Sequence, residues 1–339
     1  MGERSSALGE KLVTYKRILI TGGSGLIAGR MAQRLAGAGC FVKLGTRSSE
    51  TFRLKEPSVD VFLIDWADDR GLRALCQGVD VIVNAMGMNA NDCIKDPVGA
   101  LTTNGVYTTR LLQAAVVSGV RRFIQLSTAH VYSSSLSGTI TEMTCTTNPH
   151  PYASSHLAAE MALLWAAQRG GIEVAVMRLS NAFGRPVNSE SPCWTLLVNE
   201  LCRQAVELRV LRLRSSGVQH RDFVPMSKVC ELISYACLVK SIEELKVRPK
   251  DPPVFNVGSG FSMSVREMAE LIQERCQAVL GYRVELKSPE TCPNECVTSL
   301  RFLSETLRVP LRIELTDFIS EVDELLIFCR ASFVPQEPG

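Results

Sequence analysis

The sequence predicts an α/β protein built on a doubly wound parallel sheet, with a smaller region toward the C-terminal side. Short apolar runs alternate with helical segments through the first half of the 339-residue chain, and a glycine-rich turn follows the first run. Prolines interrupt this alternation after about residue 182. With 46% hydrophobic and 21% charged residues, the chain suits one large domain and a smaller one.

The individual elements follow from the apolar runs and the segments between them. Because strands that alternate with helices form parallel sheets covered on both faces, we expect a Rossmann-type topology that binds ligands at the carboxyl ends of its strands. The predicted strands are 17–21, 40–44, 59–65, 79–84, 122–127 and 173–178, and the predicted helices are 26–35, 68–76, 96–118 and 151–169.

The regular alternation of predicted strands and helices ends after Asn181. Prolines at 186, 192, 225 and 252–253 separate the later segments, among which 254–257 is predicted as a late strand. A helix over 264–279 is predicted to begin with a capping box formed by Ser264 and Glu267. We therefore expect a flexible N-terminal arm over 1–15, a dinucleotide-binding domain over 16–181, and a mainly substrate-binding domain over 182–339.

Composition excludes several functional classes. The net charge of +2 gives no reason to expect a nucleic-acid partner, and no apolar run reaches the roughly 18 residues of a membrane span. The first residues lack the apolar core of a signal peptide, which predicts a cytoplasmic location. The twelve cysteines show no C-x-x-C spacing, and the close pair Cys292 and Cys296 lacks a neighbouring histidine, so we expect no metal site.

The glycine-rich turn predicts a cofactor. Gly22 permits the tight turn, Gly25 lets backbone N–H groups approach a pyrophosphate at the helix N-terminus, and Ala28 permits close packing of the helix on the sheet. The predicted contacts of this loop are Gly22, Gly23, Ser24, Gly25, Leu26 and Ile27.

The end of the second strand indicates which dinucleotide binds. It carries no acidic residue to accept a ribose 2′-hydroxyl, whereas Arg47 can pair with a 2′-phosphate and the hydroxyls of Thr46 and Ser48 can assist. These residues predict NADP(H), with NAD as the alternative. Asp65, at the end of the third strand, is placed either to accept from the adenine amino group or to cap a helix, a role for which Asp68 competes.

Taken together, these motifs resemble the extended short-chain dehydrogenase/reductase family, in the NAD(P)-dependent epimerase/dehydratase branch that works on nucleotide sugars. The resemblance spans residues from about 16 to about 280. It is carried by the glycine loop 21–29, Asp65-Trp66, Asn84-Ala85-Met86-Gly87, Asn104, Ser127-Thr128 with Val131-Tyr132, Tyr152, Arg178 to Pro186, Arg221-Asp222-Phe223-Val224, and Phe255 to Gly260.

The resemblance implies a role for each matching position. Thr128 would hydrogen-bond the reacting oxygen, Tyr152 would be the general acid/base, and Asn181 and Arg221 would hold the diphosphate of a nucleotide sugar. This suits hydride transfer, because a phenol and a hydroxyl can stabilise and protonate the alkoxide that forms. The further cofactor contacts implied are Trp66, Ala85, Gly87, Asn104, Tyr152 and His156.

His156 is where the chain departs from the family pattern, Tyr-x-x-x-Lys. The family lysine binds the nicotinamide ribose, and its charge lowers the pKa of the tyrosine. His156 lies on the same helical face as Tyr152 and can donate to a ribose, but a histidine of ordinary pKa, near ~6.5, is mostly neutral at pH 7. Three interpretations remain open: an active enzyme with a rearranged relay, a slow enzyme, or a protein that binds without turnover.

From these residues we predict an NADP(H)-dependent ketoreductase acting on a nucleotide-linked 4-keto-hexose. The alternatives are a nucleotide-sugar epimerase or dehydratase with tightly bound NAD, and a non-catalytic protein that binds NADP(H) or a nucleotide sugar. The resemblance also implies a homodimer, formed through the helix after the fourth strand and the Tyr152 helix.

Overall fold

The computed structural model describes residues 17–47, 56–289, 299–309 and 311–334. The predicted N-terminal arm, Ser48, Cys292 and Cys296 therefore lie outside the described residues. Within these ranges no helix is both long enough and apolar enough to cross a membrane.

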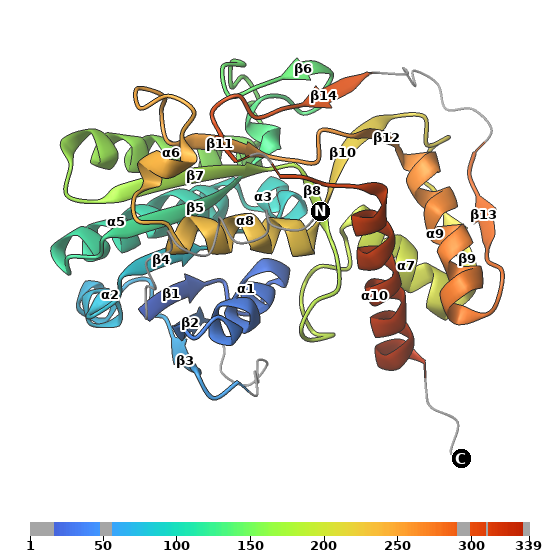
Figure 1. The fold of residues 1–339 in the computed structure, drawn as a ribbon, viewed down its shortest axis with the longest axis horizontal. Coiled ribbons are helices and arrows are strands. Elements are labelled where there is room, and N and C mark those ends of the chain that lie inside the picture. Colours follow the sequence, from blue (N-terminus) through green and yellow to red (C-terminus); the bar gives the residue numbers. More distant parts are fainter. Residues whose placement is uncertain (1–16, 48–55, 290–298, 310, 335–339) are drawn as a thin grey trace, which may run out of the picture.

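A seven-stranded sheet forms the centre of the molecule (Figure 1), in the order β11-β7-β5-β4-β1-β2-β3. Every neighbouring pair in it is parallel. This confirms the predicted doubly wound, Rossmann-type sheet, whose order reverses between β1 and β4. The strands are β1 (Arg17–Thr21), β2 (Phe41–Thr46), β3 (Val59–Leu63), β4 (Val81–Asn84), β5 (Arg122–Thr128), β7 (Glu173–Leu179) and β11 (Val254–Val257).

Helices cover both faces of this sheet because its strands are apolar on both sides. Ile18 and Ile20 pack with α1 (Leu26–Gly37) and α8 (Met226–Leu238). Leu19, between them in the sequence, packs on the opposite face. That second face is covered by α2 (Asp69–Cys76), α5 (Thr108–Val117) and α6 (Pro151–Arg169).

The helix predicted over 96–118 is interrupted. Asp96 caps α4 (Pro97–Ala100), which continues into the π-helical turn η2 (Leu101–Tyr107) and then into α5. A short helix that the sequence did not predict, α3 (Ala90–Lys95), precedes it. Because π-helical turns are concentrated at functional sites, the position of Asn104 inside η2 is informative.

The remaining elements gather at one end of the sheet (Figure 1). Three small sheets, β12-β10-β8, β13-β9 and β14-β6, are combined there with three helices. Of these helices only α9 was predicted, and its capping box of Ser264 and Glu267 is confirmed. The elements are β6 (Gly138–Ile140), β8 (Asn181–Phe183), α7 (Leu197–Leu208), β9 (Val210–Arg212), β10 (His220–Pro225), β12 (Ser262–Ser264), α9 (Val265–Leu280), β13 (Glu285–Lys287), β14 (Leu300–Phe302) and α10 (Leu315–Phe333).

The chain returns from this end to the large sheet. Helix α8 packs on α1, and β11 extends the sheet beyond β7, although both lie after residue 182. Residues after 182 therefore also contribute to the large sheet and to the helices that cover it. The physical reason is that β7 would otherwise be an exposed edge, and β11 pairs with it from Val254↔Val176 to Val257↔Leu179.

A buried ion pair holds α6 on the sheet. Arg178 Nη2 lies 2.6 Å from Glu160 Oε2, and the side chains of Arg178 and Glu160 are 6% and 0% exposed. Ser127 donates a hydrogen bond to Glu160. Arg178 also donates to the Tyr132 hydroxyl at 2.9 Å, and that hydroxyl donates to Asn256 Oδ1 at 2.7 Å. Strands β5, β7 and β11 are thereby joined to the helix.

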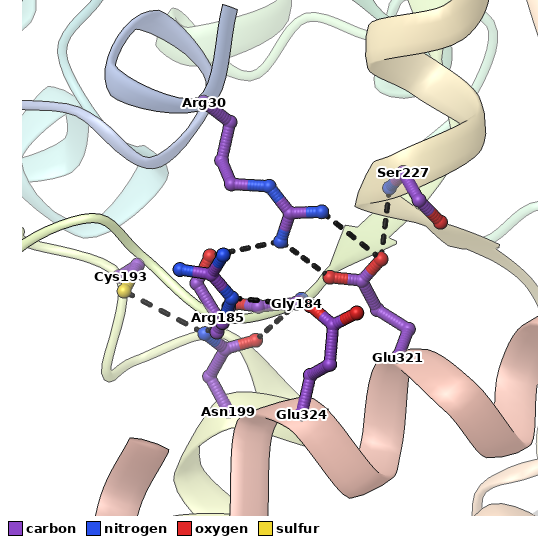
Figure 2. A network of polar contacts seen from close by, with 8 residues as sticks. All are labelled: Arg30, Gly184, Arg185, Cys193, Asn199, Ser227, Glu321 and Glu324. Carbon is purple, nitrogen blue, oxygen red and sulfur yellow. Dashed lines mark hydrogen bonds and ion pairs between the residues drawn. The ribbon is translucent and has the colours of Figure 1, made fainter. Parts of the chain in front are cut away.

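A second network joins the C-terminal helix to the rest of the molecule, as Figure 2 shows. Arg30 of α1 donates to Glu321 Oε1 of α10 at 2.6 Å and to the Arg185 carbonyl at 3.2 Å. Glu321 Oε2 accepts from Ser227 N, at the start of α8, at 2.8 Å. The outer pair of Arg185 and Glu324 is partly exposed.

The two networks predict different stability costs. Glu160→Gln removes the negative charge that neutralises a buried arginine, so the free energy of unfolding in urea should fall by about 3–5 kcal/mol. Glu324→Gln breaks the partly exposed pair and should cost no more than about 1 kcal/mol. Similar small losses in both variants would contradict the role given to Glu160.

Candidate active site

The glycine loop lies at the carboxyl end of β1, where the strand order reverses. Gly22 has a φ of +79°, and a Cβ placed on it would lie 2.6 Å from the Ala85 carbonyl oxygen. Gly23 N donates to the Gly45 carbonyl at 2.9 Å, and Gly25 N to the Gly22 carbonyl at 2.8 Å. A side chain at Gly22 would therefore separate the ends of β1 and β4.

The residues of this loop fit a dinucleotide. Helix α1 begins after Gly25 with no side-chain cap and no acidic residue in its first turn. The first N–H groups of α1 and the positive end of its helix dipole could therefore bind a pyrophosphate. Ala28 is fully buried where the helix meets the sheet.

The expected adenosine residues surround the ends of β2 and β3. Thr46 is buried, and Arg47 after it is exposed. Asp65 is exposed, and its Oδ1 accepts from Ala67 N at 2.9 Å, whereas Asp68 caps α2 by accepting from Arg70 N at 2.9 Å. The competing helix-cap role thus belongs to Asp68, and Asp65 stays at the surface.

The buried Trp66 stacks on Tyr107 of η2, with ring centroids 5.6 Å apart. This contact connects the Asp65 segment to the π-helical turn that carries Asn104.

On the nicotinamide side, three predicted residues converge. A Cβ placed on Gly87 would lie 3.6 Å from Asn104 Oδ1 and 3.7 Å from His156 Cε1. Asn104 is buried, accepts from Met88 N at 2.8 Å and donates to Ser155 Oγ at 2.9 Å. The turn after β4, η2 and α6 therefore meet at this point.

Thr128 and Tyr152 also come together, at the carboxyl end of β5 and the first turn of α6. Burial raises the pKa of the Tyr152 phenol, and a hydrogen bond from Thr128 opposes that shift. The ring of His156 lies against that of Tyr152, with centroids 4.7 Å apart and nearly perpendicular planes. The predicted catalytic residues are therefore adjacent.

His156 is 6% exposed, and burial lowers its pKa to about 4. Its Nδ1 is buried without a hydrogen-bond partner among the described residues. The imidazole is therefore neutral at pH 7, as the sequence predicted, and its ionisation falls well below the ordinary histidine range. It supplies no positive charge to Tyr152.

The expected substrate residues lie on two paired strands of the small sheet. Asn181 on β8 donates to the Asp222 carbonyl at 2.9 Å, and β8 runs parallel to β10. Arg221 on β10 is partly buried, burial lowers its pKa, and it forms no ion pair with any described residue. A guanidinium left in this state is suited to an anionic ligand.

Asp222 is a structural residue of the site that sequence reasoning passed over, although it belongs to the quoted Arg221-Asp222 motif. Its carboxylate accepts from Ser259 N at 2.9 Å and Gly260 N at 2.8 Å. Burial raises its pKa to about 6, while these hydrogen bonds oppose the rise. It fixes the 258–260 turn beside Arg221.

The described residues contain no group of three or more His, Cys, Asp or Glu side chains that could hold a metal ion. They contain instead a dinucleotide-type glycine loop, an adjacent Thr128 and Tyr152, and an Arg221 guanidinium that forms no ion pair with a described residue. This combination is typical of enzymes that use a nicotinamide dinucleotide.

The NAD dependent epimerase/dehydratase family model matches residues 18–258, and the chain belongs to this family. The expected resemblance to extended short-chain dehydrogenases/reductases is confirmed. Its relatives include a dehydrogenase, dehydratases and epimerases that are named for nucleotide-linked sugars.

Two curated relatives illustrate the range of activities. A dTDP-6-deoxy-L-talose 4-dehydrogenase (NAD(P)(+)) of Kitasatospora kifunensis is 28% identical over 268 residues, covering 76% of this chain and 78% of the relative. A dTDP-glucose 4,6-dehydratase of Streptomyces griseus is 24% identical over 275 residues, covering 78% and 80%.

Solved structures share the fold over nearly the whole chain. A UDP-N-acetylglucosamine 4-epimerase from Methanobrevibacter ruminantium M1 aligns with a TM-score of 0.76 at 18% identity, covering 93% of this chain and 98% of its own. MoeE5, in complex with UDP-glucose and NAD, aligns with a TM-score of 0.71 at 22% identity, covering 91% and 98%.

The buried imidazole predicts a pH-dependent stability. A histidine whose pKa is lower in the folded than in the unfolded protein binds fewer protons when folded, so stability falls as the pH drops through ~6.5 toward 4. Wild type should lose about 2 kcal/mol from this group between about pH 7.5 and pH 5.

The measurement is urea unfolding of wild type and His156→Gln across this range. Asp222, with its raised pKa, contributes with the opposite sign, so the difference between the two proteins is the relevant quantity. His220→Gln serves as the control. A difference that does not vary with pH would contradict the neutral, buried state of His156.

Proposed function

We propose that the protein reduces a nucleotide-linked 4-keto-hexose with NADPH. The observation that carries this proposal is the uncharged pair of Tyr152 and His156: a phenol whose pKa is raised, beside an imidazole that is neutral at pH 7. Such a phenol is a proton donor rather than a base.

Bound NADPH would supply the hydride. In this proposal the Tyr152 phenol delivers its proton to the oxygen of the carbonyl, while Thr128 donates a hydrogen bond to the same oxygen. His156 and Asn104, beside Gly87, orient the cofactor's ribose and ring, and Asn181 with Arg221 holds the diphosphate. Because Tyr152 starts as the protonated phenol, no neighbouring positive charge is needed to hold it in the donating form, and the phenolate left after the transfer takes up a proton from water before the next turnover.

The same argument separates the alternatives. An epimerase or dehydratase that begins by oxidising a sugar hydroxyl needs a base at that oxygen, and a neutral His156 does not favour the phenolate. The 4-dehydrogenase relative, named for NAD(P)(+), supports chemistry at the same carbon with either cofactor. A protein that only binds its ligands would show neither reaction.

The choice of NADPH rests on the end of β2. Arg47 is exposed there, and the preceding strand end lacks an acidic residue. Its guanidinium forms no ion pair with a described residue, which leaves it able to pair with a 2′-phosphate. Asp65, Trp66, Ala85 and the 22–27 loop complete the proposed cofactor site.

The reaction is tested by following NADPH oxidation with a dTDP- or UDP-linked 4-keto-6-deoxyhexose. Tyr152→Phe should lower kcat by roughly 10²–10⁴-fold, since it removes the proton donor and keeps the packing, while ligand binding by thermal shift stays unchanged. Tyr282→Phe, outside the site, is the matched control. Isomerisation without net NADPH oxidation would instead favour the epimerase, and binding without either reaction the non-catalytic protein.

The cofactor preference is tested by the dissociation constants of NADPH and NADH at fixed ionic strength. Arg47→Ala should weaken NADPH by about 10- to 100-fold, the range for a lost hydrogen bond to a charged group, and leave NADH nearly unchanged. Arg214→Ala, another exposed arginine, should change neither. Equal affinities of the two cofactors in wild type would rule out the preference.

We also propose that the protein forms a homodimer through α5 and α6. Apolar side chains are exposed along both helices: Val117 is 73% exposed, Trp165 62%, and Met161 50%. A groove lined by these helices and α2 lies beside Trp165. Because a two-fold axis places the same patch on both subunits, a second copy of the chain would cover this face.

Trp165→Lys should halve the molar mass measured by light scattering, because a charge would be buried in the apolar interface. Leu208→Lys, at the end of α7 and 52% exposed, should leave the mass unchanged. A wild type that is monomeric at micromolar concentration would overturn the dimer proposal.

A further inference from the structure

His150 caps the helix that carries the proposed proton donor. The residue lies directly before α6, and its Nδ1 accepts a hydrogen bond from Tyr152 N at 3.1 Å. Pro151 occupies the first helical position and has no N–H, so Tyr152 N is the first backbone donor of the helix. The His150 carbonyl accepts from Ser154 N at 2.9 Å. His150 therefore holds the first turn of α6 through its side chain and its backbone.

This cap requires one charge state of the imidazole. A ring nitrogen that accepts a hydrogen bond carries no proton, so the proton of the neutral His150 ring lies on Nε2. Protonation of Nδ1 would remove the acceptor and place a positive charge at the positive end of the helix dipole. The usual N-cap residues, such as serine and asparagine, accept the same hydrogen bond and do not titrate between pH 5 and 8. A histidine in this position therefore makes the first turn of α6 sensitive to pH.

The cap belongs to a closed set of hydrogen bonds around the proposed catalytic pair. Asn148 Oδ1 accepts from His150 N at 3.1 Å, and Asn148 Nδ2 donates to the His130 carbonyl at 2.7 Å. His130 N, in the short turn after β5, donates to Thr128 Oγ1 at 3.1 Å. Thr128 is in turn hydrogen-bonded to the Tyr152 phenol. The relative position of Thr128 and Tyr152 therefore depends on every bond in this set, the cap included.

His150 is the member of this set whose contribution a proton can remove between pH 5 and 8. The side chains of Asn148 and Thr128 do not ionise, and His130 takes part through its backbone N–H and carbonyl. Burial raises the pKa of the Tyr152 phenol above its ordinary value, so Tyr152 stays protonated throughout this range.

The charges around His150 do not compensate for a lost cap. His130, after β5, interacts electrostatically with His150 and with Arg221 of β10, and each of these groups is cationic when it is charged. The first turn of α6 holds no acidic residue. Among the described residues no carboxylate forms an ion pair with His150. A protonated His150 would therefore lose its bond to Tyr152 N without gaining a counter-charge.

We propose that His150 is a positioning residue for Tyr152, whose neutral imidazole holds the first turn of α6 and whose protonation releases it, so that the reaction slows as the pH falls. The inference rests on the proposed function for the reaction that is slowed, whereas the cap itself needs no substrate. Because a proton donor must stay within hydrogen-bond reach of the reacting oxygen, a small displacement of Tyr152 is costly.

The direction of the pH dependence follows from the cap. Only the neutral ring accepts from Tyr152 N, so the first turn is fully capped at pH values above the range in which histidines titrate. As the pH falls through that range, the protonated ring favours the released turn, because it makes no bond in the capped one.

Hydrogen exchange tests the cap without any ligand. In the full chain, the peptide that spans residues 150–156 is followed by mass spectrometry at pH 7.5 and pH 5.5, with the intrinsic pH dependence of exchange removed. Protection of this peptide in wild type should be about 2- to 30-fold lower at pH 5.5, the range for a lost N-cap. His150→Asn, a cap that does not titrate, should keep its protection at both pH values, and His150→Ala should lack it at both.

His220→Gln, on β10, is the control and should show the pH dependence of wild type. The comparison of wild type with His150→Asn does not depend on whether the alanine variant folds, because both proteins are capped at pH 7.5. An equal change of protection with pH in these two proteins would overturn the inference. So would wild-type protection in His150→Ala at pH 7.5.

The proposed reduction gives a second readout. Between pH 7.5 and pH 5.5 the kcat for NADPH oxidation should fall by about 10- to 100-fold in wild type and much less in His150→Asn, while the two proteins bind NADPH equally at each pH. The expected exchange pattern without any NADPH-dependent reduction would contradict only the proposed function. A reduction that slows equally in both proteins at low pH would contradict only this inference.

Discussion

The buried pair of Arg178 and Glu160 is the interaction on which the site depends. It joins β7 to α6 with both charges withdrawn from water, and Ser127 and Tyr132 supply further hydrogen bonds. An ion pair of this kind adds little net stability relative to apolar packing, but it is costly to break and has one favourable geometry. It thereby fixes the rotation of α6 on the sheet, and with it the positions of Tyr152 and His156 opposite Thr128.

The chemistry proposed for the site depends on the charge of the residues beside Tyr152. His156 is buried against Tyr152 and stays neutral, while Arg221 on β10 forms no ion pair with a described residue. In the proposed reduction, Tyr152 would therefore donate its proton beside a neutral imidazole. This arrangement favours protonation of a carbonyl oxygen over abstraction of a proton from an alcohol.

The C-terminal helix α10 connects the large sheet's covering helices α1 and α8 to the smaller sheets at the other end of the molecule. Glu321 of α10 accepts hydrogen bonds from Arg30 of α1 and from Ser227 N in the first turn of α8, and Arg30 also donates to the carbonyl of Arg185, which follows β8. Through these contacts the helix that presents its N-terminus to the pyrophosphate is linked to the strand that carries a proposed diphosphate ligand.

The sequence by itself determined the parallel sheet, the bounds of α6 and the capping box of α9, because strand runs, Pro151 and Ser264–Glu267 are local signals. The resemblance of its motifs to a family also singled out Thr128, Tyr152, Gly87 and Asn104, whose roles stay predictions. The sequence could not show that β11 returns to the sheet, that α7, α8 and α10 exist, or that Asp65 leaves the helix cap to Asp68. Nor could it show the lowered pKa of His156, or that Arg221 forms no ion pair with a described residue. These depend on burial and on partners as distant as Arg30 and Glu321, 291 residues apart, which only the tertiary structure brings into contact.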